Sequence, residues 1–184
     1  MHKMIISVLG TDRPGIIAAV TKVMFEQDFN IEDVSQTILQ NQFSGSFIAS
    51  GPLSVSAENL CAAFEKSTAE FDLHFHVREL GMVGITWTAC DCDPFIITTR
   101  GPDRKGLVAS VTAFLAAHNV NVTQLKAVFR GGDDPGRNIM IYEVDIPRDV
   151  DMQALRQALR DRGSELNLQI SIQHKNIFEA INRI

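Results

Sequence analysis

The spacing of hydrophobic residues in the first half of the chain predicts a strand, a helix and then two further strands. Residues 5–9 alternate in the manner of a strand, and the next apolar positions recur at helical spacing on one face: Ile16, Val20, Val23 and Met24. A second strand begins near Asn30 and meets a third across a hairpin. The third strand ends at Pro52, because proline has no N–H to donate to a ladder.

A second helix and a fourth strand complete this half. Leu60 and Phe64 lie on one face of the expected helix, and residues 71–77 show the strict alternation of a strand. The resulting order, βαββαβ, is typical of the α+β class. We therefore expect a ferredoxin-like domain, in which a four-stranded antiparallel sheet carries both helices on one face.

The second half of the chain repeats this pattern. Residues 4–38 align without a gap with residues 95–129, and ten of the 35 aligned pairs are identical. The later parts align only when four more residues are allowed for, which indicates an extended hairpin loop at residues 131–136. The repeat predicts two domains of the same fold, residues 1–90 and residues 91–184.

The alignment also places the elements of the second half. They are a strand at 96–100, a second strand beginning near Asn121, a third ending at Pro147, a helix with Leu155 and Leu159, and a strand at 166–172. Two additional elements are expected outside the repeat. Residues 82–88 favour a strand between the domains, and residues 175–184 favour a short C-terminal helix with its apolar residues on one side.

Composition and charge narrow the class of function. The chain has 17 Lys and Arg against 22 Asp and Glu, a net charge of −5. Neither half has the basic excess that neutralising phosphates requires, so direct binding of nucleic acid is not expected. No stretch approaches the roughly 18 apolar residues that cross a bilayer, and the N-terminus has no secretory signal. The three cysteines do not make a disulfide framework, which favours a cytoplasmic protein.

Two loop motifs carry a family resemblance. The run from Gly10 to Ile16, followed by Asn30-Ile31-Glu32-Asp33, resembles the first strand, loop and helix of an ACT domain. Gly101 to Leu107, with Asn121-Val122, is a second copy. The stretch 30–40 and the two-copy arrangement are similar to the glycine cleavage system transcriptional repressor-like group.

The resemblance implies a regulatory protein. ACT domains typically bind amino acids or other small metabolites where two domains meet, near the first β–α loop, and often associate side by side. For this chain it implies a small amino acid as ligand, with glycine or serine as first candidates, and no cofactor or metal. It also implies a homodimer whose protein partner is a DNA-binding regulator or an enzyme. The loop at 131–136 departs from the simple pattern and could reshape or block one of the two sites.

The candidate ligand site in each half is the loop before the first helix, together with the start of the next strand. A helix N-terminus presents unpaired N–H groups to a carboxylate, and glycine lets a ligand approach the backbone. Aspartate can accept from an ammonium group, arginine can pair with a carboxylate, and asparagine can do both. The candidate residues are Asp12, Arg13, Gly15, Ile16, Asn30 and Ile31 in the first half, and Asp103, Arg104, Gly106, Leu107, Asn121 and Val122 in the second.

Each of these residues also has a structural interpretation. Asp12 and Asp103 can cap the helix, the asparagines can occupy a left-handed turn after it, and the arginines can pair with a neighbouring group. The run Cys90-Asp91-Cys92-Asp93 is interpreted as linker, because C-x-C is not the usual spacing of zinc ligands. His74 and His76 share one face of a strand, but the sequence shows no further metal ligands beside them.

No motif nominates a catalytic centre. A phosphate loop, a nucleophile elbow and an H-E-x-x-H pair are all missing from the sequence. The expected function is therefore a non-enzymatic, amino-acid-sensing regulator of glycine or one-carbon metabolism that acts through a partner protein. Two alternatives stay open: a ligand-independent interaction and dimerisation module, and a regulatory subunit of a separate metabolic enzyme.

Overall fold

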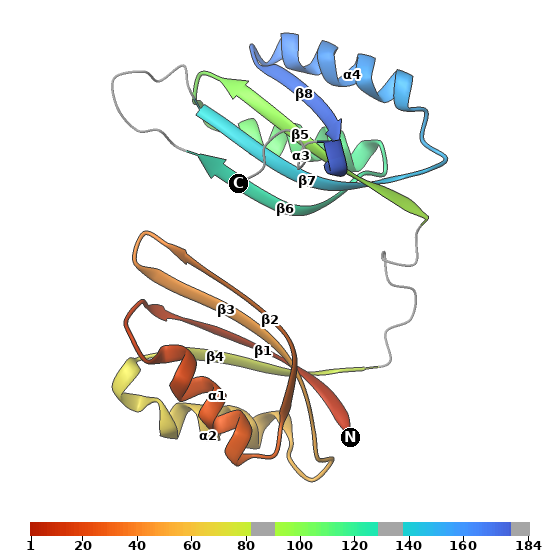
Figure 1. Cartoon of the computed structure of the whole chain (residues 1–184). Helices are drawn as coiled ribbons and strands as arrows, with labels where there is room; N and C mark the ends of the chain where they lie inside the picture. Colours follow the sequence, from red (N-terminus) through yellow and green to blue (C-terminus); the bar gives the residue numbers. More distant parts are fainter. Residues whose placement is uncertain (82–90, 129–137, 178–184) are drawn as a thin grey trace. The chain divides into compact units, whose positions relative to one another are not determined.

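The chain forms two compact units, Met1–Gly84 and Ile85–Ile184. The computed structural model describes residues 1–81, 91–128 and 138–177, and each unit is considered by itself (Figure 1). The strand expected at 82–88, the loop at 131–136 and the C-terminal helix beyond Ile177 lie outside the described residues. The domain boundary after residue 90 stays a prediction.

The first unit is an antiparallel sheet of four strands with two helices on one face (Figure 1). Its elements are β1 (His2–Thr11), α1 (Ile16–Glu26), β2 (Asn30–Leu39), β3 (Gln42–Gly51), α2 (Ala57–Ser67), the 3-10 turn η1 (Ala69–Phe71) and β4 (His74–Leu80). The strand order is β2-β3-β1-β4, which makes β2 and β4 the edge strands.

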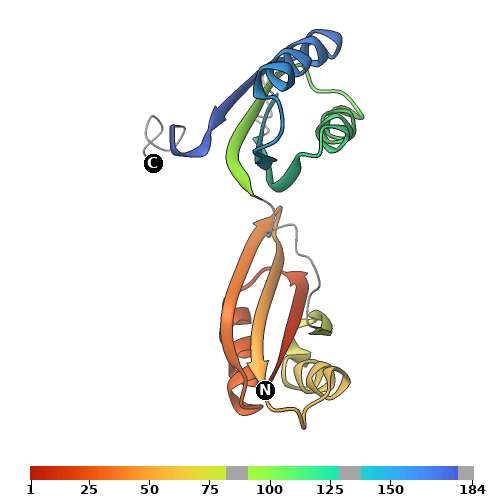
Figure 2. The same ribbon diagram turned by 90° about the vertical axis from the view of Figure 1, so that its right-hand side faces the viewer.

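The second unit has the same architecture (Figure 2). Its elements are β5 (Cys92–Gly101), α3 (Leu107–Ala117), β6 (Asn121–Val128), β7 (Asn138–Pro147), α4 (Met152–Glu165) and β8 (Gln169–His174). The order β6-β7-β5-β8 leaves β6 and β8 at the edges, and every pairing is antiparallel. Two βαββαβ domains of the α+β class are therefore confirmed.

Each unit has its own hydrophobic core between sheet and helices. Met4, Ile6 and Val8 alternate along β1 and are 0% exposed, because the helices cover that face of the sheet. The predicted stripe of α1 is confirmed, since its four apolar residues are all at most 2% exposed. The second core is built in the same way around Ile97 and Tyr142.

The fourth strand of each unit begins later than expected. β4 begins at His74 and not at residue 71, because η1 prolongs the helical path and Asp72 then takes a left-handed backbone with φ 50°. β8 begins at Gln169 and not at residue 166, after Asn167 takes the same conformation with φ 53°. Sequence alternation does not reveal such a turn, because the alternating residues continue through it.

The interpretation of residues 90–93 as linker is wrong for Cys92 and Asp93, which form the start of β5. Arg148 stabilises this start with ion pairs to Asp93 at 3.0 Å and Asp91 at 2.8 Å. A hydrogen bond from Arg148 to Asp93, together with the charges of both carboxylates, raises the pKa of this arginine. Cys61 is a free thiol.

Candidate functional site

Each first helix begins at a glycine with a left-handed backbone. Gly15 precedes α1 with φ 100°, and Gly106 precedes α3 with φ 86°. Neither helix start is capped by a side chain, so the interpretation of Asp12 and Asp103 as capping residues is wrong. The N–H groups of these first turns therefore have no side-chain acceptor and can bind an anionic group.

The two aspartates have different partners. The backbone N–H of Asp12 donates to the carbonyl of Asn41 at 2.8 Å, which extends the strand pairing beyond β1. The carboxylate of Asp103 instead accepts from Nδ2 of Asn138 at 3.1 Å. Asn138 is 8% exposed, and its Oδ1 has no hydrogen-bond partner among the described residues. A buried acceptor without a donor is costly, so this oxygen is ready to accept a bond from a ligand.

Asn138 is a candidate site residue that the sequence-based prediction missed. It occupies the place that Phe43, a core residue, has in the first half. A polar residue at a position that is apolar in the other copy is a signal that the alignment contained. The insertion at 131–136 directly precedes Asn138 and obscured this correspondence.

Both loop arginines contact the backbone of their own unit. Arg13 donates through Nη2 to the carbonyl of Glu70, and its guanidinium lies 4.6 Å from the centre of the Phe71 ring. Arg104 donates through Nη2 to the carbonyl of Leu166 at 3.0 Å. These contacts tie the β–α loop to the segment that follows the second helix and agree with the structural interpretation. A guanidinium has five donors, so each arginine keeps further donors for a ligand carboxylate.

The apolar candidates face the cores. Ile16 and Leu107 are 2% and 3% exposed, so a ligand can reach only their backbone N–H groups. Ile31 and Val122 are half-buried and pack against the core of their own unit. These four side chains shape the helix and strand starts and do not line an open site.

Asn30 and Asn121 lie far from the loops within their units. Asn30 is paired with Ser50, which is paired with Lys3, whereas the loop begins after Thr11. Eight residues of strand span roughly 25 Å, so one small ligand cannot contact both ends of a unit. In the second unit, Asn121 is likewise at the far end of the sheet from the loop.

The left-handed turn after each helix does not involve these asparagines either. It falls on Asp28 with φ 60° and Asn119 with φ 57°, two residues earlier. The interpretation of Asn30 and Asn121 as turn residues is therefore wrong, because both already belong to strands.

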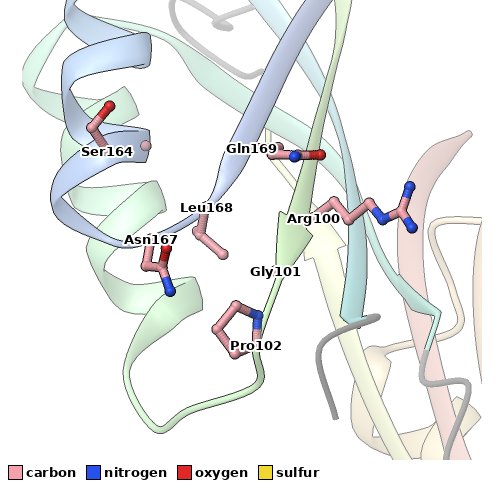
Figure 3. A pocket seen from close by; sticks show the side chains of 8 residues that line it. Arg100, Gly101, Pro102, Ser164, Asn167, Leu168 and Gln169 are labelled. Atoms are coloured by element: carbon pink, nitrogen blue, oxygen red, sulfur yellow. The ribbon is translucent and has the colours of Figure 1, made fainter. Parts of the chain in front are cut away.

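A pocket of about 490 Å³ opens beside the loop of the second unit (Figure 3). It is lined by Arg100, Gly101, Pro102, Gly163, Ser164, Asn167, Leu168 and Gln169. Gly101 joins this pocket to the polar pair above, because it is the cross-strand partner of Asn138. The loop, the pocket and the Asp103–Asn138 pair thus surround the same end of β5.

No metal site is found within the described ranges. No group of three His, Cys, Asp or Glu side chains gathers there, and His74 and His76 are exposed on β4. Among the helices of the described residues, none is both long and apolar enough to cross a membrane.

The chain is similar to several known proteins. The chain is 27% identical to the glycine cleavage system transcriptional repressor of Escherichia coli, over 93% of this chain and 89% of that protein. It is 33% identical to a UPF0237 protein of Methanosarcina mazei, over 49% of this chain and 95% of the relative.

The fold is shared with a solved structure of an unknown protein from Galdieria sulphuraria. The TM-score is 0.76 at 21% identity, over 94% of this chain and 98% of that one. Residues 2–78 and 93–173 each match the ACT domain family. Because these two matches account for most of the chain, the protein belongs to the ACT domain family and carries two copies of the domain.

Proposed function

We propose that this protein is a non-enzymatic regulator that senses a small amino acid and passes the signal to a partner protein. Two regulatory ACT domains and the likeness to a glycine cleavage repressor support this proposal. The same likeness makes glycine and serine the first candidate ligands, and the genes of glycine or one-carbon metabolism the proposed target. We further propose a cytoplasmic homodimer that acts through a DNA-binding regulator.

The observation that carries the proposal is the polar arrangement before α3. The carboxylate of Asp103 and the Oδ1 of Asn138, which has no partner among the described residues, can both accept hydrogen bonds, as the ammonium group of an amino acid requires. The start of α3 offers N–H groups to the carboxylate of the same ligand. A Cβ added at Gly106 would meet no atom of the described residues within 4 Å, so these residues leave space beside the helix start.

The first unit is the weaker candidate. A Cβ added at Gly15 would meet the ring of Phe71 at 3.4 Å, and Phe43 replaces the polar Asn138. We therefore place the principal site in the second unit. Asn30 and Asn121 contact the ligand only if a second copy of the chain places its own β–α loop beside them.

Thermal unfolding with glycine, serine and the other common amino acids tests the sensor. A ligand that binds only the folded state adds about 2.7 kcal/mol of stability at a hundredfold excess over Kd. We expect a shift with one or two amino acids, lost in Asp103→Ala and Asn138→Ala. Asp12→Ala, the matched change in the other copy, retains it. No shift with any amino acid at millimolar concentration, or equal loss in all three variants, contradicts the proposed site.

A ligand-independent interaction module is the second candidate, and the edge strand β2 favours it. Val34, Ile38 and Leu39 are 52%, 52% and 66% exposed, and β2 pairs with β3 on only one side. Exposed apolar residues on an unpaired edge are typical of a surface that binds another chain. Partner binding that is unchanged across the amino-acid panel, but lost in Ile38→Lys, would favour this function over sensing.

A further inference from the structure

The second helix and the edge strand enclose a groove at the same place in both units. In the first unit the acidic groove, between α2 and β4, has a volume of about 360 Å³ and is lined in part by Glu58, Glu65 and Phe75. In the second unit the basic groove, between α4 and β8, has a volume of about 230 Å³ and is lined in part by Arg156 and Arg160. Both grooves lie on the opposite edge of the sheet from β2 and β6.

The two grooves have the same apolar floor. Phe75 and Val77 form it in the acidic groove, and the equivalent Ile170 and Ile172 form it in the basic groove. All four side chains are only partly buried and pack against their own core. Their remaining exposed surface becomes buried if a second protein surface covers the groove.

The charged residues that line the two grooves differ between the two copies of the domain. Glu65 and Arg160 occupy equivalent positions on α2 and α4, and both side chains are exposed. Within the described part of the chain, neither has an ion pair; the contact of Glu65 is with the thiol of Cys61 at 3.9 Å. The helix start keeps Glu58 ionised, because its own backbone amide and the hydroxyl of Ser56 lower the pKa of this carboxyl.

We propose that the acidic groove of one chain binds the basic groove of a second copy, with Glu65 of each chain facing Arg160 of the other. Each chain carries one acidic and one basic groove, so each groove has a partner of opposite charge on a second copy. Two acidic grooves repel each other, and so do two basic grooves. The charges therefore favour the pairing of an acidic groove with a basic one. The proposal rests on the homodimer of the proposed function and names its surface, but it does not depend on the ligand, because none of these residues belongs to the proposed amino-acid site.

Charge reversal tests the pairing by sedimentation velocity. We expect the wild-type chain to be a dimer at about 50 mM salt and to dissociate partly at about 500 mM, because salt screens exposed charges. Glu65→Lys places a lysine opposite Arg160, and Arg160→Glu places a glutamate opposite Glu65, so like charges face each other and each variant alone is monomeric. An equal mixture of the two variants forms a dimer, and so does the chain that carries both changes.

Lys66→Glu is the matched control, because it changes the charge one position further around α2. It leaves the dimer intact, and circular dichroism checks that every variant is folded. A wild-type chain that is monomeric at both salt concentrations overturns the proposal. So does a dimer that persists in both single variants, or two monomeric variants that do not associate when mixed. Sedimentation in the absence of amino acids keeps this result separate from that of the sensor experiment.

Discussion

Gly10 and Gly101 occupy the same place in their units, at the end of the first strand, but an added methyl group lies at different distances from the backbone. At Gly10 a Cβ would lie 2.5 Å from the Cδ2 atom of Leu73, the end of a side chain, and 3.3 Å from the backbone carbonyl of Asp72. At Gly101 it would also lie 2.8 Å from the backbone carbonyl of Asn167, which cannot rotate away. An added methyl group would therefore press more closely on the rigid backbone at Gly101 than at Gly10.

We expect Gly101→Ala to be the more destabilising of the two substitutions. Overpacking against backbone costs about 1–3 kcal/mol, and a side chain that can change rotamer relieves part of this strain. Urea unfolding of the two variants measures the difference directly. Equal losses would show that the turn after α4 moves as easily as the side chain of Leu73.

Tyr142 is the single tyrosine of the chain and is 0% exposed, with its hydroxyl 3.3 Å from the sulfur of Met140. Burial raises the pKa of this phenol, and a hydrogen bond with Thr99 opposes the rise. Because the folded chain favours the neutral phenol, its contribution to the free energy of unfolding is fully present below the ordinary pKa of about 10. The contribution is lost as the pH rises through the higher pKa of the folded state.

Absorbance of tyrosinate in the folded chain should therefore report a titration above the ordinary pKa of tyrosine. The unfolding free energy of the wild type should decrease in the same alkaline range, and Tyr142→Phe should reduce that decrease. A midpoint at the ordinary value in the folded chain would show that the phenol is open to water.

At the scale of elements, the two helices of each unit begin in different ways. α1 and α3 begin at a left-handed glycine, whereas α2 and α4 begin at a capping side chain. Asp151 accepts from the backbone N–H groups of Gln153 and Ala154 at 2.9 and 3.1 Å, and Ser56 accepts from that of Asn59 at 3.2 Å. The first helices thus have no side-chain cap on their first N–H groups, whereas a side chain accepts from one of these groups in α2 and from two in α4.

Asp151→Ala should destabilise the protein by about 1 kcal/mol, because it removes two capping bonds and a negative charge from a helix start. Ser56→Ala should lower the stability by less, because it removes a single hydrogen bond, which is longer than those of Asp151. Thermal or urea unfolding measures both. Asp12→Ala is the control, because Asp12 does not cap α1, and a loss as large as that of Asp151→Ala would contradict the assignment of the cap.

At the scale of the whole molecule, the net charge of −5 bears on the proposed action through a DNA-binding partner. A surface without a basic excess cannot release the counterions that drive association with a duplex. We expect no binding to duplex DNA in a fluorescence anisotropy titration, even at low salt. Salt-dependent binding by this chain alone would contradict the proposed action through a DNA-binding partner.

The sequence by itself determined the fold and the duplication. The alternation in the first strands and the helical stripe of α1 appear in the structure as predicted, because burial on one face imposes a local period on the chain. The repeat of the loop motif was sufficient to identify two ACT domains, since spacing along a strand–loop–helix unit is a local property. The fourth strands were displaced because a left-handed turn leaves no mark in the hydrophobic pattern.

Only the tertiary structure decided which site residues lie together. Asn30 follows the first helix in sequence, but the antiparallel register places it at the far end of the sheet from Asp12. The same register brings Asn138 to Gly101 and beside Asp103, although more than thirty residues separate them in sequence. Strand pairing joins residues that are distant along the chain, so periodicity cannot predict it, and this is why the fold could be predicted while the polar site before α3 required the structure.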